Sequence, residues 1–290
     1  MPRRSAGPVH GAVSILGSST TTRYSKICAS GRLPQTSSDA LRIGRLDGRE
    51  VAFLARHGRT HRLLPGEIEH RANLYALKSI GVSRVFAASA VGSMRESIRP
   101  RDVVLVDQFI DRTVHRHGTF FGDGVAAHVS FADPVCPELH GVLARAGTSA
   151  GGRVHERGTY LCIEGPAFST RAESRLYRDW DVDVIGMTNL PEAKLAREAQ
   201  ICYATLALVT DYDCWHEEED DVSVAAVLDN LRANAELAAG ILRQAIRDTP
   251  RARQRCGCGR ALEHAILTPL DAIPAAVRER LRVLRGHDPS

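Results

Sequence analysis

Asp211 and Asp213 directly follow the apolar run "ICYATLALVT" at residues 201–210. A run of this kind predicts a buried strand, and alternate residues of an extended strand point to the same face. We therefore expect the two carboxylates to converge on one small volume. Neighbouring carboxylates raise one another's pKa, so one of them can hold a proton near neutral pH.

Two kinds of chemistry suit this carboxylate pair. It can hold a divalent metal ion, for which the acidic stretch "EEEDD" at 217–221 offers further oxygen ligands. It can instead read the edge of an adenine, where N7 accepts a hydrogen bond and the 6-amino group donates one. A protonated aspartate at N7 turns the purine into a good leaving group, which is general-acid catalysis. The residues alone leave both uses open.

A second group of candidate residues is suited to an anion. "FLARHGRTH" places Arg56, His57 and Arg59 in one tight loop, and guanidinium groups match the oxygens of phosphate. The small residues of "SAVGSMRESI" at 89–98 let backbone N–H groups approach an anion, and Thr188 adds a hydroxyl. No G-x-x-x-x-G-K-[ST] and no complete G-x-G-x-x-G is present, which disfavours a nucleoside-triphosphate enzyme and leaves open a free phosphate bound by scattered loops.

Short apolar runs alternate with helical patterns along the chain. Strands are predicted at 51–55, 84–89, 102–107, 160–165, 183–187 and 202–210, and helices at 66–81, 169–181 (capped by Ser169), 190–200 and 222–246. This alternation predicts an α/β fold: a single domain with a twisted, mixed, mostly parallel β-sheet flanked by helices. Ligands of such sheets bind at the C-terminal ends of the strands, where the candidate residues lie.

The domain division and the location follow from composition. Residues 1–248 form the predicted catalytic domain, and the Arg-rich segment 249–290 is a loosely attached extension with one short helix at 275–284. No stretch approaches the roughly 18 apolar residues that span a bilayer, so we expect a cytoplasmic protein without a membrane partner. The net charge is only +4 and the basic segment lacks aromatic residues, so no nucleic-acid partner is predicted.

The seven cysteines are scattered, and most read as small core residues in a reducing compartment. Cys256 and Cys258 form an isolated C-x-C pair. Two ligands do not complete a zinc site. We therefore predict no metal site, and prefer a strained disulfide or no function for this pair.

Four long motifs carry a resemblance to a known family. They are "FLARHGRTH", "SAVGSMRESIRPRDVVLVDQFIDRT", "IEGPAFSTRAES" and "GMTNLPEAKLAREAQICYATLALVTDYDCW". Over about residues 38–246 the chain resembles the methylthioadenosine phosphorylases of the trimeric purine nucleoside phosphorylase superfamily. The resemblance implies a nucleoside phosphorylase-like fold and a homotrimer or dimer of trimers. It implies that phosphate displaces adenine from 5′-methylthioadenosine, with no cofactor, because inorganic phosphate is a co-substrate.

The resemblance also implies a role for each matching residue. Asp211 protonates adenine N7 and Asp213 reads the exocyclic amine. The phosphate ligands it implies are Ser19, Arg56, His57, Ser89, Ala90 and Thr188. The nucleoside contacts it implies are Phe168 on the purine, Met187 beneath the ribose, Val222, Val224, Val227 and Leu228 around the methylthio group, and His128 from across a trimer interface.

The chain departs from the family at its first loop. Where the family has a glycine-rich "GG-[ST]-G", this sequence reads Gly17, Ser18, Ser19, Thr20, and loss of the flanking glycines strains a loop that needs positive φ. A catalytically weak homologue is therefore one alternative, and a broader purine nucleoside phosphorylase is another. The D-Y-D pair favours aminopurines, because a buried group that loses its hydrogen-bond partner is costly.

Overall fold

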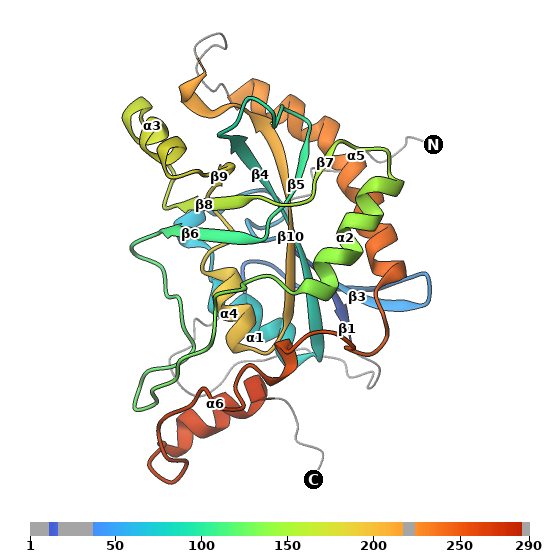
Figure 1. The fold of residues 1–290 in the computed structure, drawn as a ribbon. Coiled ribbons are helices and arrows are strands. Elements are labelled where there is room, and N and C mark those ends of the chain that lie inside the picture. The colour runs from blue at the N-terminus through green and yellow to red at the C-terminus, as the bar shows by residue number, and fades with distance from the viewer. Residues whose placement is uncertain (1–11, 17–36, 217–223, 286–290) are drawn as a thin grey trace.

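The computed structural model describes residues 12–16, 37–216 and 224–285 (Figure 1). Ser19, the loop at 17–20, the acidic stretch 217–221 and Val222 lie outside the described residues. The predictions made for them stay predictions.

The elements alternate along the chain much as the apolar runs do. The strands are β1 (Ala12–Leu16), β2 (Arg42–Leu46), β3 (Arg49–Leu54), β4 (Val82–Ser93), β5 (Val103–Leu105), β6 (Gln108–Arg112), β7 (Val154–His155), β8 (Thr159–Ile163), β9 (Val184–Gly186) and β10 (Cys202–Asp211). The α-helices are α1 (His70–Ser79), α2 (Pro137–Ser149), α3 (Arg171–Asp179), α4 (Glu192–Glu198), α5 (Val224–Asp248) and α6 (Ala275–Arg285). Short 3₁₀ turns include η2 (Asp213–Trp215) and η3 (Cys258–Arg260).

One mixed sheet organises the molecule around the parallel neighbours β4 and β10. Its strand order is β2-β3-β1-β4-β10-β5-β7, and β9, β8 and β6 continue from the end of β4. The mixed sheet with flanking helices is thus confirmed. Four of the nine pairings between described strands are parallel. The antiparallel share exceeds the prediction because short connections such as the β2–β3 hairpin make antiparallel neighbours.

Strand β10 is buried from Cys202 to Thr210 because helices cover both of its faces. Ala204, Leu206 and Leu208 pack in a cluster with α2 and α5. Tyr203, Ala207 and Val209, which point the other way, belong to a cluster with α1, α4 and α6. Figure 1 shows α2 and α5 to the right of β10 and α4 to its left. Strands buried on both faces read as continuous hydrophobic runs rather than alternating ones.

The C-terminal extension packs firmly on the domain, so the prediction of a loosely attached tail is wrong. The predicted short helix is present as α6, and its residues Val277, Leu281 and Leu284 are buried in the same cluster as α1. Spacings of four and three place these residues on one helix face, which leaves Arg278, Arg282 and Arg285 exposed, while Arg280 is buried and pairs with Asp123. Ile266 also forms a β-bridge with Ala127.

Two details of the helices differ from the prediction. The N-cap of α3 is Thr170 rather than Ser169, because Glu173 completes a capping box with Thr170. Helix α2 was not predicted from its residues. Among the described residues, no helix is long and apolar enough to cross a membrane.

Candidate active site

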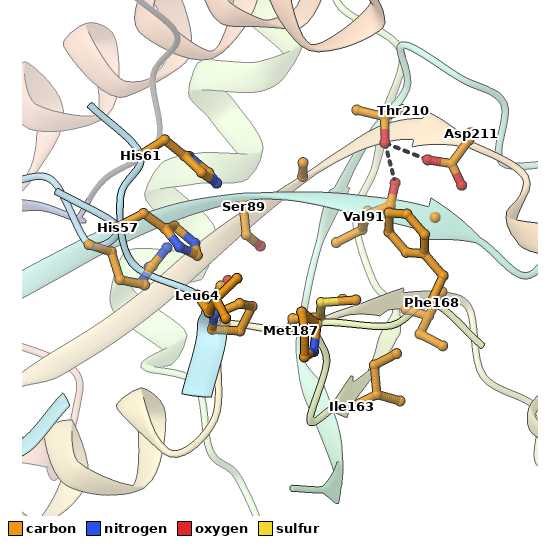
Figure 2. A pocket seen from close by; sticks show the side chains of 18 of the residues that line it. His57, His61, Leu64, Ser89, Val91, Ile163, Phe168, Met187, Thr210 and Asp211 are labelled. Carbon is orange, nitrogen blue, oxygen red and sulfur yellow. Dashed lines mark hydrogen bonds between the residues drawn. The ribbon is translucent and has the colours of Figure 1, made fainter. Parts of the chain in front are cut away.

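A cavity of about 380 Å³ opens at the C-terminal ends of β4, β9 and β10. Figure 2 shows His57 and His61 at its left end, Asp211 and Phe168 at its right end, and Met187 between them. Most of the predicted site residues that the structure describes meet here: Arg56, His57, Ser89, Ala90, Phe168, Met187, Thr188, Asp211 and Asp213. Segments far apart in the chain therefore supply the lining of one cavity.

The two aspartates converge, but not by strand alternation. Strand β10 ends at Asp211, and Asp213 begins the 3₁₀ turn η2 with a positive φ of 54°. The backbone N–H of Asp213 donates to Oδ1 of Asp211 at 2.9 Å, and the Thr210 hydroxyl donates to Oδ2 of Asp211 at 2.7 Å. A tight turn that is closed by Asp211 itself therefore brings the second carboxylate to the cavity.

Gly92 makes room for the Asp211 carboxylate. The two residues are partners in the β4–β10 register. A Cβ atom on Gly92 would lie 2.9 Å from Oδ1 of Asp211, which is closer than real side chains approach. At position 92 the close neighbour is thus a carboxylate of the protein, and not the anion predicted for the small residues of this segment.

Burial raises the pKa of both Asp211 and Asp213 above the ordinary value for aspartate. For Asp211, hydrogen bonds from Thr210 and from the Asp213 backbone act in the opposite direction. The charge of Asp211 also raises the pKa of Asp213, but less than burial does. The expected shift is present, and its main cause is desolvation rather than repulsion between the two carboxylates.

Two buried hydroxyls, those of Ser89 and Thr188, also line the cavity. Ser89 and Thr188 are 4% and 7% exposed, and neither hydroxyl makes a hydrogen bond of regular geometry within the described residues. The Tyr160 hydroxyl lies beside both of them. Because buried polar groups normally have partners, these two hydroxyls are suited to an anionic ligand.

His57 lines the cavity as a neutral side chain. Burial lowers the pKa of His57 to about 4, and the charge of Arg56 lowers it further, against the hydrogen bond to Leu63. Its Nδ1 lies 2.9 Å from the Leu63 carbonyl oxygen, which can only accept, so Nδ1 carries the proton near neutral pH.

Arg56 is held by an acidic partner, Glu192, which lies far from it in the chain. Its Nε and Nη2 donate to the two carboxylate oxygens of Glu192, each at 2.8 Å, and both side chains are 2% exposed. Burial alone would lower the pKa of Arg56, but Glu192 raises it above its ordinary value. Glu192 begins the helix in "LPEAKLAREA", where Lys194, Arg197 and Glu198 are charged as well, so no local pattern distinguishes it.

Arg59 does not join the anion end of the cavity, contrary to the predicted three-residue basic loop. Its Nε donates to Asp39 at 2.9 Å on the surface. His128 is exposed and does not line the cavity of a single chain. Val224, Val227 and Leu228 fall in the first turns of α5, where the side chains are outside the described part of the structure.

The buried His70 beside Glu192 predicts a pH-dependent stability. Its Nδ1 lies 3.9 Å from Glu192, and burial lowers the pKa of His70 to about 3. In the unfolded chain this histidine takes up a proton near its ordinary pKa. At pH values between its two pKa values, the unfolded chain therefore binds one more proton than the folded chain. We expect the free energy of unfolding to fall by about 1.4 kcal/mol for each unit that the pH decreases from about 6 to 4 because of His70 alone.

Urea unfolding of the wild type and His70→Gln across this range measures the effect. The variant should have the shallower dependence on pH, by about one proton. His264→Gln, at an exposed histidine, should follow the wild type. If the free energy of unfolding depended on pH equally in the wild type and in His70→Gln, His70 would not be held neutral in the folded chain.

The fold and the cavity define a class of protein. A model of the phosphorylase superfamily matches residues 14–247, which include every described residue of the cavity. The matched span runs from β1 to the end of α5, so the whole central sheet belongs to it.

Similar proteins narrow the class to one family. An S-methyl-5′-thioadenosine phosphorylase of Geobacter sulfurreducens is 57% identical over 250 residues, covering 86% of this chain and 87% of that protein. One of Thermosynechococcus vestitus is 56% identical over 85% of this chain and 86% of its own length. The chain therefore belongs to the methylthioadenosine phosphorylase family.

Solved structures agree with this family. A methylthioadenosine phosphorylase from an Antarctic soil metagenomic library superposes with a TM-score of 0.83 and 50% identity, over 86% of this chain and 88% of that one. The methylthioadenosine phosphorylase of Schistosoma mansoni in complex with adenine gives a TM-score of 0.72 and 34% identity, over 76% and 83% of the two chains.

Proposed function

We propose that this protein cleaves 5′-methylthioadenosine with inorganic phosphate, releasing adenine and 5-methylthioribose 1-phosphate. One observation carries the proposal: a single cavity is lined by the buried hydroxyls of Ser89 and Thr188 and by protonatable aspartates, with Ser89 and Asp211 apart from one another in Figure 2. A phosphate and a purine joined through a ribose need this separation of an anion site from an acid. The relatives named methylthioadenosine phosphorylase support the choice of nucleoside.

The proposed reaction uses one acid. A phosphate oxygen attacks C1′ of the ribose while the bond from C1′ to N9 breaks, and its electron pair passes to the purine. Asp211 donates its proton to N7, so adenine leaves as a neutral base. The raised pKa of Asp211 keeps that proton available at higher pH than an exposed aspartate would.

The other residues of the cavity are assigned to the part of the substrates that each would contact. His57, Arg56 and Ala90 contact the phosphate with the two hydroxyls, Met187 lies under the ribose, and Phe168 packs on the purine. Phe168 is 54% exposed, which suits an aromatic ring that a base would cover. Asp213 accepts from the exocyclic amine, which favours 6-aminopurines over 6-oxopurines.

Further features belong to the same proposal. The segment with Val222, Val224, Val227 and Leu228 encloses the methylthio group, and Ser19 reaches the phosphate. The protein acts as a homotrimer in which His128 completes a neighbouring site, in the cytoplasm, in methionine and purine salvage. No cofactor takes part.

The test is the release of adenine from methylthioadenosine with and without phosphate. We expect release only when phosphate is present, with methylthioribose 1-phosphate formed in equal amount. Adenosine serves as a competing substrate, because a Schistosoma mansoni relative is named adenosine/methylthioadenosine phosphorylase. Inosine serves as the competing 6-oxopurine nucleoside. Release that ignores phosphate would indicate a hydrolase, and tight binding without release a silent homologue.

A further inference from the structure

Four cysteines from three distant parts of the chain meet at one point. Cys136 precedes α2, Cys202 begins β10, and Cys256 and Cys258 lie in the C-terminal extension. Their Sγ atoms all lie within 4.8 Å of one another, and Sγ of Cys202 is 3.6 Å from Sγ of Cys256. All four are free thiols. The C-x-C pair, which looked isolated in the sequence, thus acquires two further sulfur neighbours.

The spacing fits a shared metal ion. A Zn²⁺ ion with four sulfur ligands at about 2.3 Å needs sulfur–sulfur distances of about 3.8 Å, since these are the edges of the tetrahedron. A disulfide needs about 2.0 Å. Four thiolates in a tetrahedron select zinc or iron over magnesium, calcium or manganese.

The protein holds the four sulfur atoms in place through other contacts. The backbone N–H of Cys136 donates to the Tyr203 carbonyl at 2.8 Å, which fixes it beside the start of β10. The carboxylate of Glu138 accepts from the backbone N–H groups of Gln254 and Arg255 at 2.9 and 3.1 Å. The supporting residues therefore position ligands from both sides of the site, as a preorganised metal centre requires.

The segment that bears the C-x-C pair is anchored a second time by Arg253. This side chain donates to the carbonyls of Ser83 and Gln200 at 3.0 and 2.9 Å. A Cβ atom on Gly259 would lie 2.1 Å from the Arg253 guanidinium, so a larger residue after Cys258 would displace this anchoring side chain. The second glycine of "CGCG", Gly259, thus leaves room for the Arg253 side chain beside Cys258.

Burial and charge also suit a closed thiolate site. Cys136, Cys202 and Cys258 are at most 5% exposed. Four thiolates around a divalent ion carry a net charge of about −2, which needs cations nearby. Arg197 acts electrostatically on Cys258, and Lys78 interacts with Cys202.

We propose that Cys136, Cys202, Cys256 and Cys258 bind one Zn²⁺ ion that fastens the C-terminal extension to the central sheet. The four thiols lose their protons to solvent as the sulfur–zinc bonds form. Four protein ligands leave no open position for substrate, which marks a structural rather than a catalytic site. Strand β10 separates Cys202 from Asp211 by about 30 Å, so the ion does not take part in the cavity's chemistry.

The test begins with metal analysis of the full chain, purified under reducing conditions without chelator. We expect one zinc ion per chain. Metal-free reduced protein titrated with Co²⁺ should give the visible absorption of a tetrahedral cobalt–thiolate centre, and Zn²⁺ should displace it. The double variant Cys256→Ser/Cys258→Ser should bind zinc at least about 100-fold more weakly. Cys162→Ser, at a buried cysteine outside the cluster, should bind zinc like the wild type.

Hydrogen exchange supplies a readout that does not depend on the variants. Removing the ion from the wild type should reduce amide protection in residues 249–285, and adding Zn²⁺ should restore it. The proposal is overturned if reduced protein binds neither Zn²⁺ nor Co²⁺ stoichiometrically, or if the double variant retains wild-type zinc affinity. Unchanged exchange on metal removal would overturn the fastening role.

Discussion

Asp211→Asn should lower the rate of methylthioadenosine phosphorolysis by about 10²- to 10⁴-fold, since a positioned general acid contributes about this much. Asparagine keeps the shape of the side chain, and its one amide oxygen can accept the hydrogen bond from the Asp213 backbone. Its NH2 group can donate to the Thr210 hydroxyl, which can itself donate to the Val91 carbonyl instead. It has no proton to give to N7. The effect should therefore appear in kcat more than in KM.

The pH profile distinguishes a lost proton donor from a disturbed site. A general acid works only while it is protonated, so wild-type activity should fall as the pH rises through the raised pKa of Asp211. The variant should lack this limb of the profile. Asp271→Asn, at an exposed aspartate, is the matched control and should retain wild-type kcat. A near-wild-type rate for Asp211→Asn would remove Asp211 from the mechanism.

Glu192→Gln should lower the free energy of unfolding by about 3–5 kcal/mol, because it leaves the buried charge of Arg56 without its partner. The wild-type pair forms two parallel hydrogen bonds of 2.8 Å in a site where both side chains are 2% exposed. Glu192 also accepts from the Tyr203 hydroxyl at 3.0 Å, so the substitution disturbs the centre of the sheet as well. Chemical denaturation at neutral pH measures the loss.

The same substitution at an exposed ion pair is the control. Glu279 pairs with Arg282 on the surface of α6, and Glu279→Gln should leave the unfolding transition where it is. If Glu192→Gln were as stable as Glu279→Gln, the Arg56 charge would have another counter-ion and the buried pair would not stabilise the fold.

Much of the site could be predicted from sequence because its residues follow apolar runs. The strand predicted at 202–210 and the Asp211 that ends it are both confirmed. What periodicity could not show was the turn beyond it. Asp213 reaches the cavity through a positive φ of 54°, and an extended strand has no such torsion.

Glu192 and the cysteine cluster were not predictable because their partners are far away in the chain. Glu192 contacts Arg56, which lies 136 residues earlier in the chain. Cys256 meets Cys202 across 54 residues. A local pattern carries no information about a pairing that forms only when the sheet closes.

The sequence by itself determined the order of the elements, the apolar runs of the buried strands and the chemical groups at the strand ends. Backbone geometry and hydrophobic periodicity are local properties, so they can be read from neighbouring residues. Only the tertiary structure decided which of these groups share a volume. It paired Arg56 with Glu192, turned Arg59 away to the surface, and packed α6 into the core. Burial then shifted the pKa values of the ionisable groups in the cavity, because desolvation depends on what surrounds a group in space and not on its neighbours in the chain.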